Sequence, residues 1–161
     1  MKKTLSEPML LLIAILIIGA SGVWAGPKEI NYDGRFIAYD NGTVKRYKTG
    51  LMWAAKDNGE DMNWAAAKRY CENYRGGGYA DWRMPTVEEL KGLAEPKPTY
   101  LVEIRHLYIT MLIELSSTGV WASETDGSKA HGYSFDYPPG PFVIDQSLSD
   151  DYRALPVRSG K

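Results

Sequence analysis

The chain has 161 residues, of which 44% are hydrophobic and 12% aromatic, enough for one domain with a sizeable core. Its formal net charge of −1 excludes a general electrostatic attraction to nucleic acid or to an anionic membrane surface. The single cysteine, Cys71, excludes an internal disulfide, so the packing of the core must supply the stability.

The first 25 residues have the features of a secretory signal peptide. Two lysines precede an unbroken apolar run over residues 9–18, and Val23 and Ala25 lie three and one residues before an expected cleavage site at Gly26. The alternative is an uncleaved membrane anchor, but a spanning helix needs a longer run of about 20 apolar residues. We therefore expect cleavage after Ala25 and export to the periplasm or to the outside of the cell.

Residues 26–161 are expected to form a single domain. They contain 17 basic and 19 acidic residues, a balance that again gives no preference for nucleic acid. Contact with the membrane would arise only through the signal segment, if that segment stayed uncleaved.

The N-terminal part of this domain has the pattern of short strands. The pair Asn41-Gly42 suits a tight hairpin turn between two of them. A third strand contains Trp53 and has the continuous apolar character of a buried strand. The expected segments are a loose lead-in over residues 31–34 and strands over residues 35–39, 43–48 and 51–54.

A first helix is expected from Trp64 to about Tyr74, with Asn63 as its N-cap. Four residues recur at helical spacing along one face: Trp64, Ala67, Cys71 and Tyr74. We expect this face to pack on the core, which would make Cys71 a buried and unreactive thiol.

A glycine-rich turn leads from this helix into a second one. Three consecutive glycines, residues 76–78, end the first helix because glycine adopts a C-cap conformation without a clash. Pro85 favours an extended residue before it, and Thr86 and Glu89 have the spacing of a capping box. We expect a helix over residues 87–94 and a structural rather than catalytic role for this corner.

The C-terminal half combines one helical pattern with several strand patterns. Helical spacing predicts a further helix or two helical turns at Leu101, Ile104, Tyr108, Met111 and Leu115. Strands are expected over residues 120–123, 130–137, 142–144 and 152–157, with Tyr133, Phe135 and Tyr137 on one face of the second.

Separated motifs recur through nearly the whole domain. They are Thr49-Gly50-Leu51-Met52-Trp53, Trp64 with Ala67 and Tyr70-Cys71, Gly78-Tyr79-Ala80-Asp81-Trp82-Arg83-Met84-Pro85-Thr86 with Glu89-Leu90, Val120-Trp121-Ala122-Ser123, and Arg153-Ala154-Leu155-Pro156-Val157-Arg158. Their order and spacing resemble the Lcl C-terminal domain family, a bacterial domain of unknown function named for the C-terminal part of a Legionella collagen-like adhesin. The resemblance covers residues 36–158, and the chain has no collagen-like Gly-X-Y repeat.

The resemblance implies an α+β fold, a variant of the C-type-lectin-like architecture in which two main helices pack on short antiparallel sheets without a disulfide. In the namesake adhesin the domain is associated with sulfated glycans and host attachment, whereas most members have no assigned activity. We expect structural roles for the motif residues Trp53, Trp64, Asp81, Trp82, Arg83, Pro85, Thr86, Glu89, Trp121 and Arg158.

Candidate ligand-binding residues are cationic or aromatic: Lys45, Arg46, Lys48, Tyr79 and Lys97. The first three could meet sulfate groups, although strand alternation places Lys45 opposite the other two, and a solvated outer strand is the alternative. Glu95-Pro96-Lys97 is similar to the Glu-Pro-Asn sugar motif of animal lectins but has a cation at its third position. A helix-ending loop is the alternative explanation for it.

The polar loop from Asp57 to Asp61 offers oxygens that could bind calcium, or it is a solvated loop; its spacing matches no EF-hand. We predict no metal site and no cofactor. His106 and His131 lack metal-ligand spacing, and no nucleophile elbow is present. Formylglycine-type oxidases need paired reactive cysteines, whereas Cys71 is alone.

We therefore expect a binding module without catalysis. The first hypothesis is a glycan-binding or adhesin-like module, whose partner would be a sulfated glycan and whose sign would be a shallow pocket with aromatic and polar or basic groups. The second is a protein-interaction or structural module of the cell envelope, favoured by an exposed apolar patch. The third is an enzyme, which would need a cleft that gathers a histidine with acids.

Overall fold

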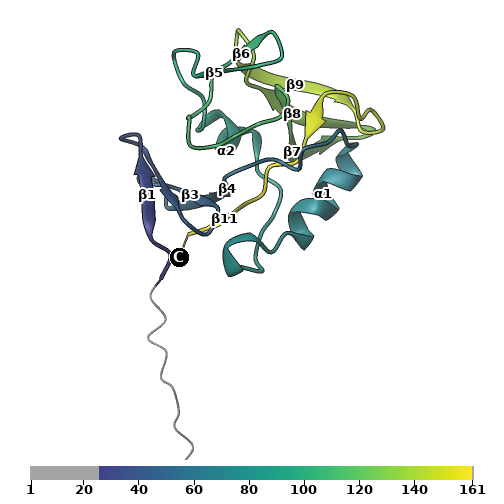
Figure 1. The fold of residues 1–161 in the computed structure, drawn as a ribbon. Helices are drawn as coiled ribbons and strands as arrows, with labels where there is room; N and C mark the ends of the chain where they lie inside the picture. The colour runs from purple at the N-terminus through teal and green to yellow at the C-terminus, as the bar shows by residue number, and fades with distance from the viewer. Residues whose placement is uncertain (1–25, 161) are drawn as a thin grey trace, which may run out of the picture.

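The computed structural model describes residues 26–160, and Figure 1 shows two main sheets with helices between and beside them. The signal-peptide prediction falls on residues 1–25, outside this range. The five-stranded sheet has the order β1 (Glu29–Tyr32), β2 (Phe36–Tyr39), β3 (Thr43–Arg46), β4 (Leu51–Ala54), β11 (Val157–Ser159). The four-stranded sheet has the order β10 (Tyr152–Arg153), β7 (Gly119–Asp126), β8 (Lys129–Ser134), β9 (Gly140–Asp145).

The five-stranded sheet is antiparallel throughout. The predicted hairpin is confirmed, since β2 pairs with β3 in a register that places Phe36 opposite Arg46. The expected loose lead-in is wrong at its start, because β1 forms an exposed edge strand on β2. On the other side, β4 pairs with β11, and Val157 also exchanges backbone hydrogen bonds of 2.9 and 3.0 Å with Arg83. The corner between the helices therefore lies at this edge.

The four-stranded sheet is a meander of three strands with one parallel strand, β10, beside β7. The buried strand residues include Val120 and Trp121 on β7 and Tyr133 on β8. The prediction of a strand that continues to Tyr137 and carries it on the face of Tyr133 is wrong: β8 ends at Ser134, and Tyr137 is exposed.

Helix α1 (Trp64–Asn73) lies beside the four-stranded sheet (Figure 1). Its predicted cap is confirmed, because Asn63 Oδ1 accepts a hydrogen bond from the Ala66 amide at 3.0 Å. Ala67 and Cys71 are fully buried, as the spacing predicts. Burial raises the pKa of the Cys71 thiol to about 12, so the reactive thiolate is disfavoured.

Helix α2 (Val87–Lys91) follows a short 3₁₀ turn (Gly76–Gly78) and the extended corner. The predicted capping box is confirmed: the Thr86 side chain accepts from the Glu89 amide at 3.2 Å, and the Glu89 carboxylate accepts from the Thr86 amide at 2.9 Å. Within residues 26–160, no helix is long and apolar enough to cross a membrane.

The predicted helical segment between residues 101 and 115 is wrong. The chain forms a small hairpin of β5 (Tyr100–Val102) and β6 (Arg105–Leu107), followed by an extended loop. The apolar residues buried here form two alternating pairs, Leu107 with Ile109 and Ile113 with Leu115, on either side of a turn at Met111, whereas Leu101, Ile104 and Met111 are exposed. Helical spacing among apolar residues is therefore coincidental in this segment.

The expected two-helix α+β, lectin-like architecture is also wrong. Among the described residues there are eleven strands, and the two α-helices contain only ten and five residues. Gly92 and the prolines after it limit α2 to five residues. The fold is mostly β, with α1 as its one substantial helix in the described part of the chain.

The main core cluster joins the two sheets through α2. Leu90 and Leu93 pack in the same buried cluster as Trp53 of β4 and Val120 of β7. A second cluster around Trp121 packs under α1 through Ala67 and Cys71. The position of α1 is therefore determined by its buried face on the four-stranded sheet.

Gly132 on β8 provides a test of this packing. A Cβ at this position would lie 2.2 Å from a ring carbon of Phe142 and 2.7 Å from the Val120 carbonyl oxygen. The Val120 backbone cannot move away easily, because it is hydrogen-bonded within the sheet. We expect Gly132→Ala to lower the free energy of unfolding by about 1–3 kcal/mol. Urea unfolding measures this change.

The matched control is Gly140→Ala, because a Cβ at Gly140 on the neighbouring strand β9 would meet no atom within 4 Å. We expect this control to change the free energy of unfolding by less than about 0.5 kcal/mol. Equal effects of the two substitutions would contradict the packing described for β8 and β9.

Candidate functional site

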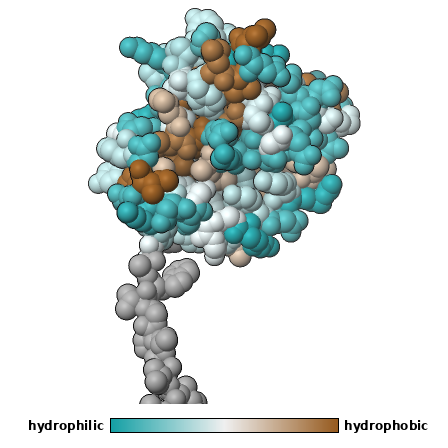
Figure 2. All heavy atoms as spheres, in the orientation of Figure 1, coloured by the Kyte–Doolittle hydropathy of each residue, from teal (hydrophilic) through white to brown (hydrophobic). Residues whose placement is uncertain are grey.

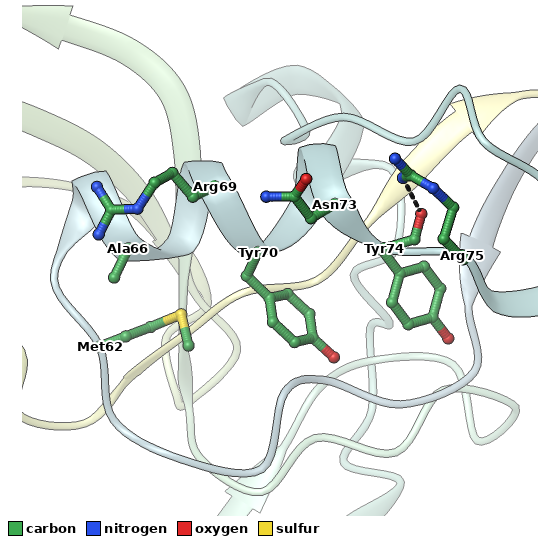
Figure 3. A pocket seen from close by; sticks show the side chains of 7 residues that line it. All are labelled: Met62, Ala66, Arg69, Tyr70, Asn73, Tyr74 and Arg75. Atoms are coloured by element: carbon green, nitrogen blue, oxygen red, sulfur yellow. Dashed lines mark hydrogen bonds between the residues drawn. The ribbon is translucent and has the colours of Figure 1, made fainter.

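An open groove runs along one flank of α1, and we call it the tyrosine groove. Its volume is about 480 Å³, and its lining consists of Met62, Ala66, Arg69, Tyr70, Asn73, Tyr74 and Arg75. Figure 3 shows the rings of Tyr70 and Tyr74 projecting from the same side of the helix, with Met62 near one end. The groove therefore presents two half-buried aromatic rings in a row.

Helical spacing brings the two tyrosines together, because residues four apart lie on the same face. Their ring centroids are 5.9 Å apart, with an angle of 36° between the planes. The edge of Tyr74 packs against buried Trp82, with centroids 5.1 Å apart, and the Trp82 indole donates a hydrogen bond of 3.1 Å to the Gly76 carbonyl. The floor of the groove is thus anchored to the corner between the helices.

Gly76 permits this packing. A Cβ at this position would lie 2.3 Å from the hydroxyl oxygen of Tyr74 and 2.4 Å from its ring carbons. The glycine turn therefore does more than end the helix, since it leaves room for the second tyrosine of the groove.

The polar groups of the groove are largely free. Within the described part of the chain, the side chains of Arg69 and Asn73 make no hydrogen bond or ion pair that meets ordinary distance criteria. One nitrogen of the Arg75 guanidinium is engaged, because Nη1 donates hydrogen bonds to the Glu72 and Tyr74 carbonyl oxygens at 2.9 and 2.7 Å. Burial raises the pKa of both Tyr70 and Tyr74, so each hydroxyl stays protonated and able to donate at neutral pH.

This arrangement suits a ligand with one apolar face and several hydroxyl or anionic groups. Aromatic rings offer a flat apolar surface, while a guanidinium pairs well with a sulfate or carboxylate. Tyrosine and asparagine supply adaptable donors and acceptors. A sugar ring has this combination of an apolar face and a polar rim.

The five candidate ligand residues from the sequence do not gather in one place. Tyr79 is used structurally, because its ring lies under the Arg158 guanidinium at 3.9 Å. The Arg46 guanidinium lies over the Phe36 ring at 5.8 Å. Lys48 and Lys97 are exposed on separate turns, and Lys45 is half-buried on β3.

Four of the residues for which we expect structural roles make contacts in the corner or lie in the core. Arg83 donates two hydrogen bonds, of 2.8 and 2.6 Å, to the Glu89 carboxylate. Pro85 accepts from the Ser123 amide at 2.8 Å, which ties the corner to β7. Trp53 is fully buried, and its indole nitrogen is the one buried side-chain nitrogen or oxygen without a partner among the described residues.

Protein donors engage the polar loop from Asp57 to Asp61, for which the sequence left calcium binding open as an alternative. The Asp57 carboxylate accepts from the Ser116 amide at 2.7 Å and from the Ser116 hydroxyl at 3.0 Å. Asn58 accepts from the Ala154 amide at 2.6 Å, and Asp61 pairs with Arg153. Within residues 26–160, no group of three or more histidine, cysteine or acidic side chains could hold a metal ion.

The two histidines lie on different sheets, His106 on β6 and His131 on β8. Within residues 26–160, neither histidine side chain makes a hydrogen bond. The tyrosine groove contains neither of them.

Sequence reasoning missed the tyrosine groove. It interpreted the first helix only through its buried face and overlooked Arg69 and Asn73 on the opposite side. The available signal was the pair Tyr70 and Tyr74 at helical spacing, followed by Arg75, because these residues continue the aromatic face beyond the core.

An exposed apolar patch is the second notable surface. It includes Leu101, Ile104 and Met111, whose side chains are 57%, 90% and 71% exposed. Figure 2 shows apolar atoms at the top of the molecule, over the β5–β6 end, with further apolar atoms in the middle of this face and on the β1 side, within a surface that is mostly hydrophilic.

A family model described as the Lcl C-terminal domain matches residues 42–158. This range contains all the residues of the tyrosine groove and the corner between the helices. No curated protein and no solved structure matches the chain.

Proposed function

Because the chain belongs to the Lcl C-terminal domain family, we propose that it is an exported, adhesin-like binding module that recognises glycans through the tyrosine groove. The proposal assigns it no catalytic reaction. Its partner would be a sugar chain outside the cytoplasm, and neither a cofactor nor a metal ion takes part in binding.

The observation that carries this proposal is the combination of Tyr70 and Tyr74 with the free side chains of Arg69 and Asn73. Two neighbouring aromatic rings offer an apolar surface to a sugar face, and the unpaired guanidinium and amide are available to its polar substituents. An adhesin needs such an open groove, because its ligand is a chain that continues beyond the site.

A glycan array of sulfated, carboxylated and neutral sugars, probed with the purified protein, tests the proposal. We expect binding that survives EDTA, and Tyr70→Ala is expected to weaken it by about fivefold, because stacking on one aromatic ring contributes on the order of 1 kcal/mol.

Tyr47→Ala is the control for that substitution, because Tyr47 is a 77% exposed tyrosine on the turn after β3, outside the groove. It should leave the affinity unchanged. Absence of binding to every sugar class, or equal losses in the two variants, would overturn the proposal.

The apolar patch around Ile104 favours a second candidate, a protein-interaction module of the cell envelope. An exposed cluster of large apolar side chains is a common feature of protein contact surfaces. If Ile104→Ser abolishes the capture of an envelope protein while Tyr70→Ala does not affect it, this second function would be supported independently of glycan binding.

A further inference from the structure

The β5–β6 hairpin, at one end of the molecule (Figure 1), ends in a turn that exposes an isoleucine. The strands pair Val102 with Arg105, so Glu103 and Ile104 are the two central residues of the turn. Glu103 adopts a left-handed conformation with φ of 55°, and Ile104 is 90% exposed. Glycine, asparagine and aspartate usually occupy such turns, because they tolerate this backbone and suit contact with water. The turn therefore presents an apolar side chain where local stability does not favour one.

A pocket lies beside the same hairpin, and we call it the Tyr100 pocket. Its volume is about 240 Å³, and its lining consists of Tyr100, Met111, Ile113 and Glu114. The Tyr100 hydroxyl donates a hydrogen bond of 2.9 Å to the Ile113 carbonyl and accepts one of 2.8 Å from the Leu115 amide, which fixes the ring. Ile113 is fully buried, whereas exposed Met111 also belongs to the apolar patch. The pocket is therefore preformed and large enough for one aliphatic side chain.

Charges of both signs flank the projecting isoleucine and the pocket. Glu103 and Arg105 are the neighbours of Ile104 in the chain. Glu114 lines the pocket and pairs with Lys56 at 2.8 Å, yet the two side chains remain 68% and 71% exposed. Glu103 makes no ion pair among residues 26–160, and the ion pair of Arg105 is long, at 3.8 Å. The turn thus offers one charge of each sign to the opposite charges beside the pocket.

One molecule carries both halves of this contact. A projecting side chain and a pocket on the same surface are complementary to themselves in a two-fold arrangement, because each copy then supplies the isoleucine to the pocket of the other. The acidic residues Glu103 and Glu114 favour a protein surface over a lipid one, since an anionic bilayer surface attracts basic residues and repels carboxylates. The occupant that fits the shape and the charges is therefore a second copy of the chain.

We propose that the apolar patch is the interface of a two-fold homodimer, in which Ile104 of each copy enters the Tyr100 pocket of the other. Glu103 of one copy faces Lys56 of the second copy, and Arg105 faces Glu114. This inference rests on the second candidate function, a protein contact through the patch around Ile104, and names a second copy as the partner. It does not depend on glycan binding.

Sedimentation velocity of the purified protein over a concentration series tests the inference. We expect an equilibrium between monomer and dimer without larger species, because a two-fold contact closes on itself. Ile104→Ser is expected to raise the dissociation constant of the dimer by about tenfold or more, because it removes an aliphatic side chain from a buried position at the interface.

The matched control is Ile30→Ser. Ile30 is also an exposed isoleucine, at 62%, but it lies on the edge strand β1, outside the hairpin and the Tyr100 pocket. We expect this control to leave the dissociation constant unchanged.

Charge reversal gives a second readout. Glu103→Lys and Lys56→Glu, each alone, place like charges across the interface and should raise the dissociation constant by about tenfold at low ionic strength. The two reversals in one chain restore opposite charges between the copies, so the double variant should return to within about threefold of the unmodified protein. A purely structural role of either residue would not produce this recovery.

The outcomes separate the dimer from the other proposals. A monomer at every concentration, equal effects of Ile104→Ser and Ile30→Ser, or a double variant weaker than each single one would overturn the inference. It is also overturned if the protein stays monomeric and floats with vesicles of phosphatidylethanolamine and phosphatidylglycerol, or binds a different envelope protein through Ile104; the last result would leave the second candidate function standing. Glycan binding by the Ile104→Ser variant reports on the tyrosine groove alone, so failure of the dimer and failure of the glycan function are distinguishable.

Discussion

Replacing Trp121 with alanine is expected to lower the free energy of unfolding by about 3–5 kcal/mol. The indole is fully buried, with its ring 6.0 Å from Phe142 of β9 and 4.8 Å from Tyr152 of β10. Its nitrogen also donates a hydrogen bond of 2.8 Å to the Met62 carbonyl, at the entrance to α1. The substitution would therefore leave a cavity between three strands and release the segment that leads into the helix.

Chemical denaturation measured by circular dichroism gives this free energy. Val143→Ala is a suitable control, because Val143 lies on the exposed side of β9 and is 50% exposed. We expect the control to change stability by less than about 0.5 kcal/mol. A loss of less than about 1 kcal/mol in Trp121→Ala would show that this cluster is not part of the core.

Replacing Arg158 with alanine is expected to cost about 3 kcal/mol of stability. Only 7% of Arg158 is exposed, and its guanidinium donates to the Asp81 carboxylate at 2.6 and 3.2 Å while lying 3.9 Å above the Tyr79 ring. One side chain thus joins β11 to the corner between the helices. The cost stays moderate because Asp81 is half exposed and water can solvate it once the arginine is gone.

The pH dependence of stability gives a second readout for Arg158→Ala. Hydrogen bonding to Arg158 lowers the pKa of Asp81 below its usual 3.8. Because its pKa is lowered in the folded state, ionised Asp81 stabilises the fold above about pH 4. This contribution to the free energy of unfolding is lost as the pH falls through the folded-state pKa. The difference in the free energy of unfolding between the unmodified protein and Arg158→Ala should therefore become smaller at acidic pH.

Arg105→Ala is the control for this experiment, because the ion pair that Arg105 makes with Asp151 is longer, at 3.8 Å, and its side chain is 43% exposed. It should cost no more than about 0.5 kcal/mol. If Arg158→Ala costs no more stability than Arg105→Ala, the contacts of Arg158 with Asp81 and Tyr79 do not stabilise the fold as described.

Local rules predicted the parts of this fold that depend on neighbouring residues. The cap at Asn63 and the capping box of Thr86 and Glu89 use side chains within three residues of the backbone that they satisfy. The Asn41-Gly42 hairpin likewise depends only on the turn between its strands. These elements could be predicted because no distant contact competes with them.

The same rules failed where tertiary packing determines the secondary structure. Leu101 and Ile104 keep helical spacing with Met111, but all three side chains are exposed. The chain forms a hairpin here, and Glu103 adopts a left-handed conformation with φ of 55° at its turn. The family resemblance predicted the membership correctly but not the mostly β architecture. A resemblance between motifs does not determine how much helix surrounds them.

The candidate site was missed for a related reason. Charged strand residues such as Arg46 and Lys48 drew attention because they lie close together in sequence, yet the first packs on Phe36 and the second lies on a turn. The tyrosine groove depends on Trp82, which supports Tyr74 from a different segment. The sequence alone does not show that contact.

The pairing of β4 with β11 has a consequence for synthesis of the protein. Met52 of β4 contacts Arg158, which is 106 positions later in the chain. At ribosomal rates of about 5–20 residues per second, that partner arrives roughly 5–20 s after β4 has been made. During this interval β4 has an unpaired edge and Trp53 is uncovered on that side, which are the features of a partly made chain that favour self-association.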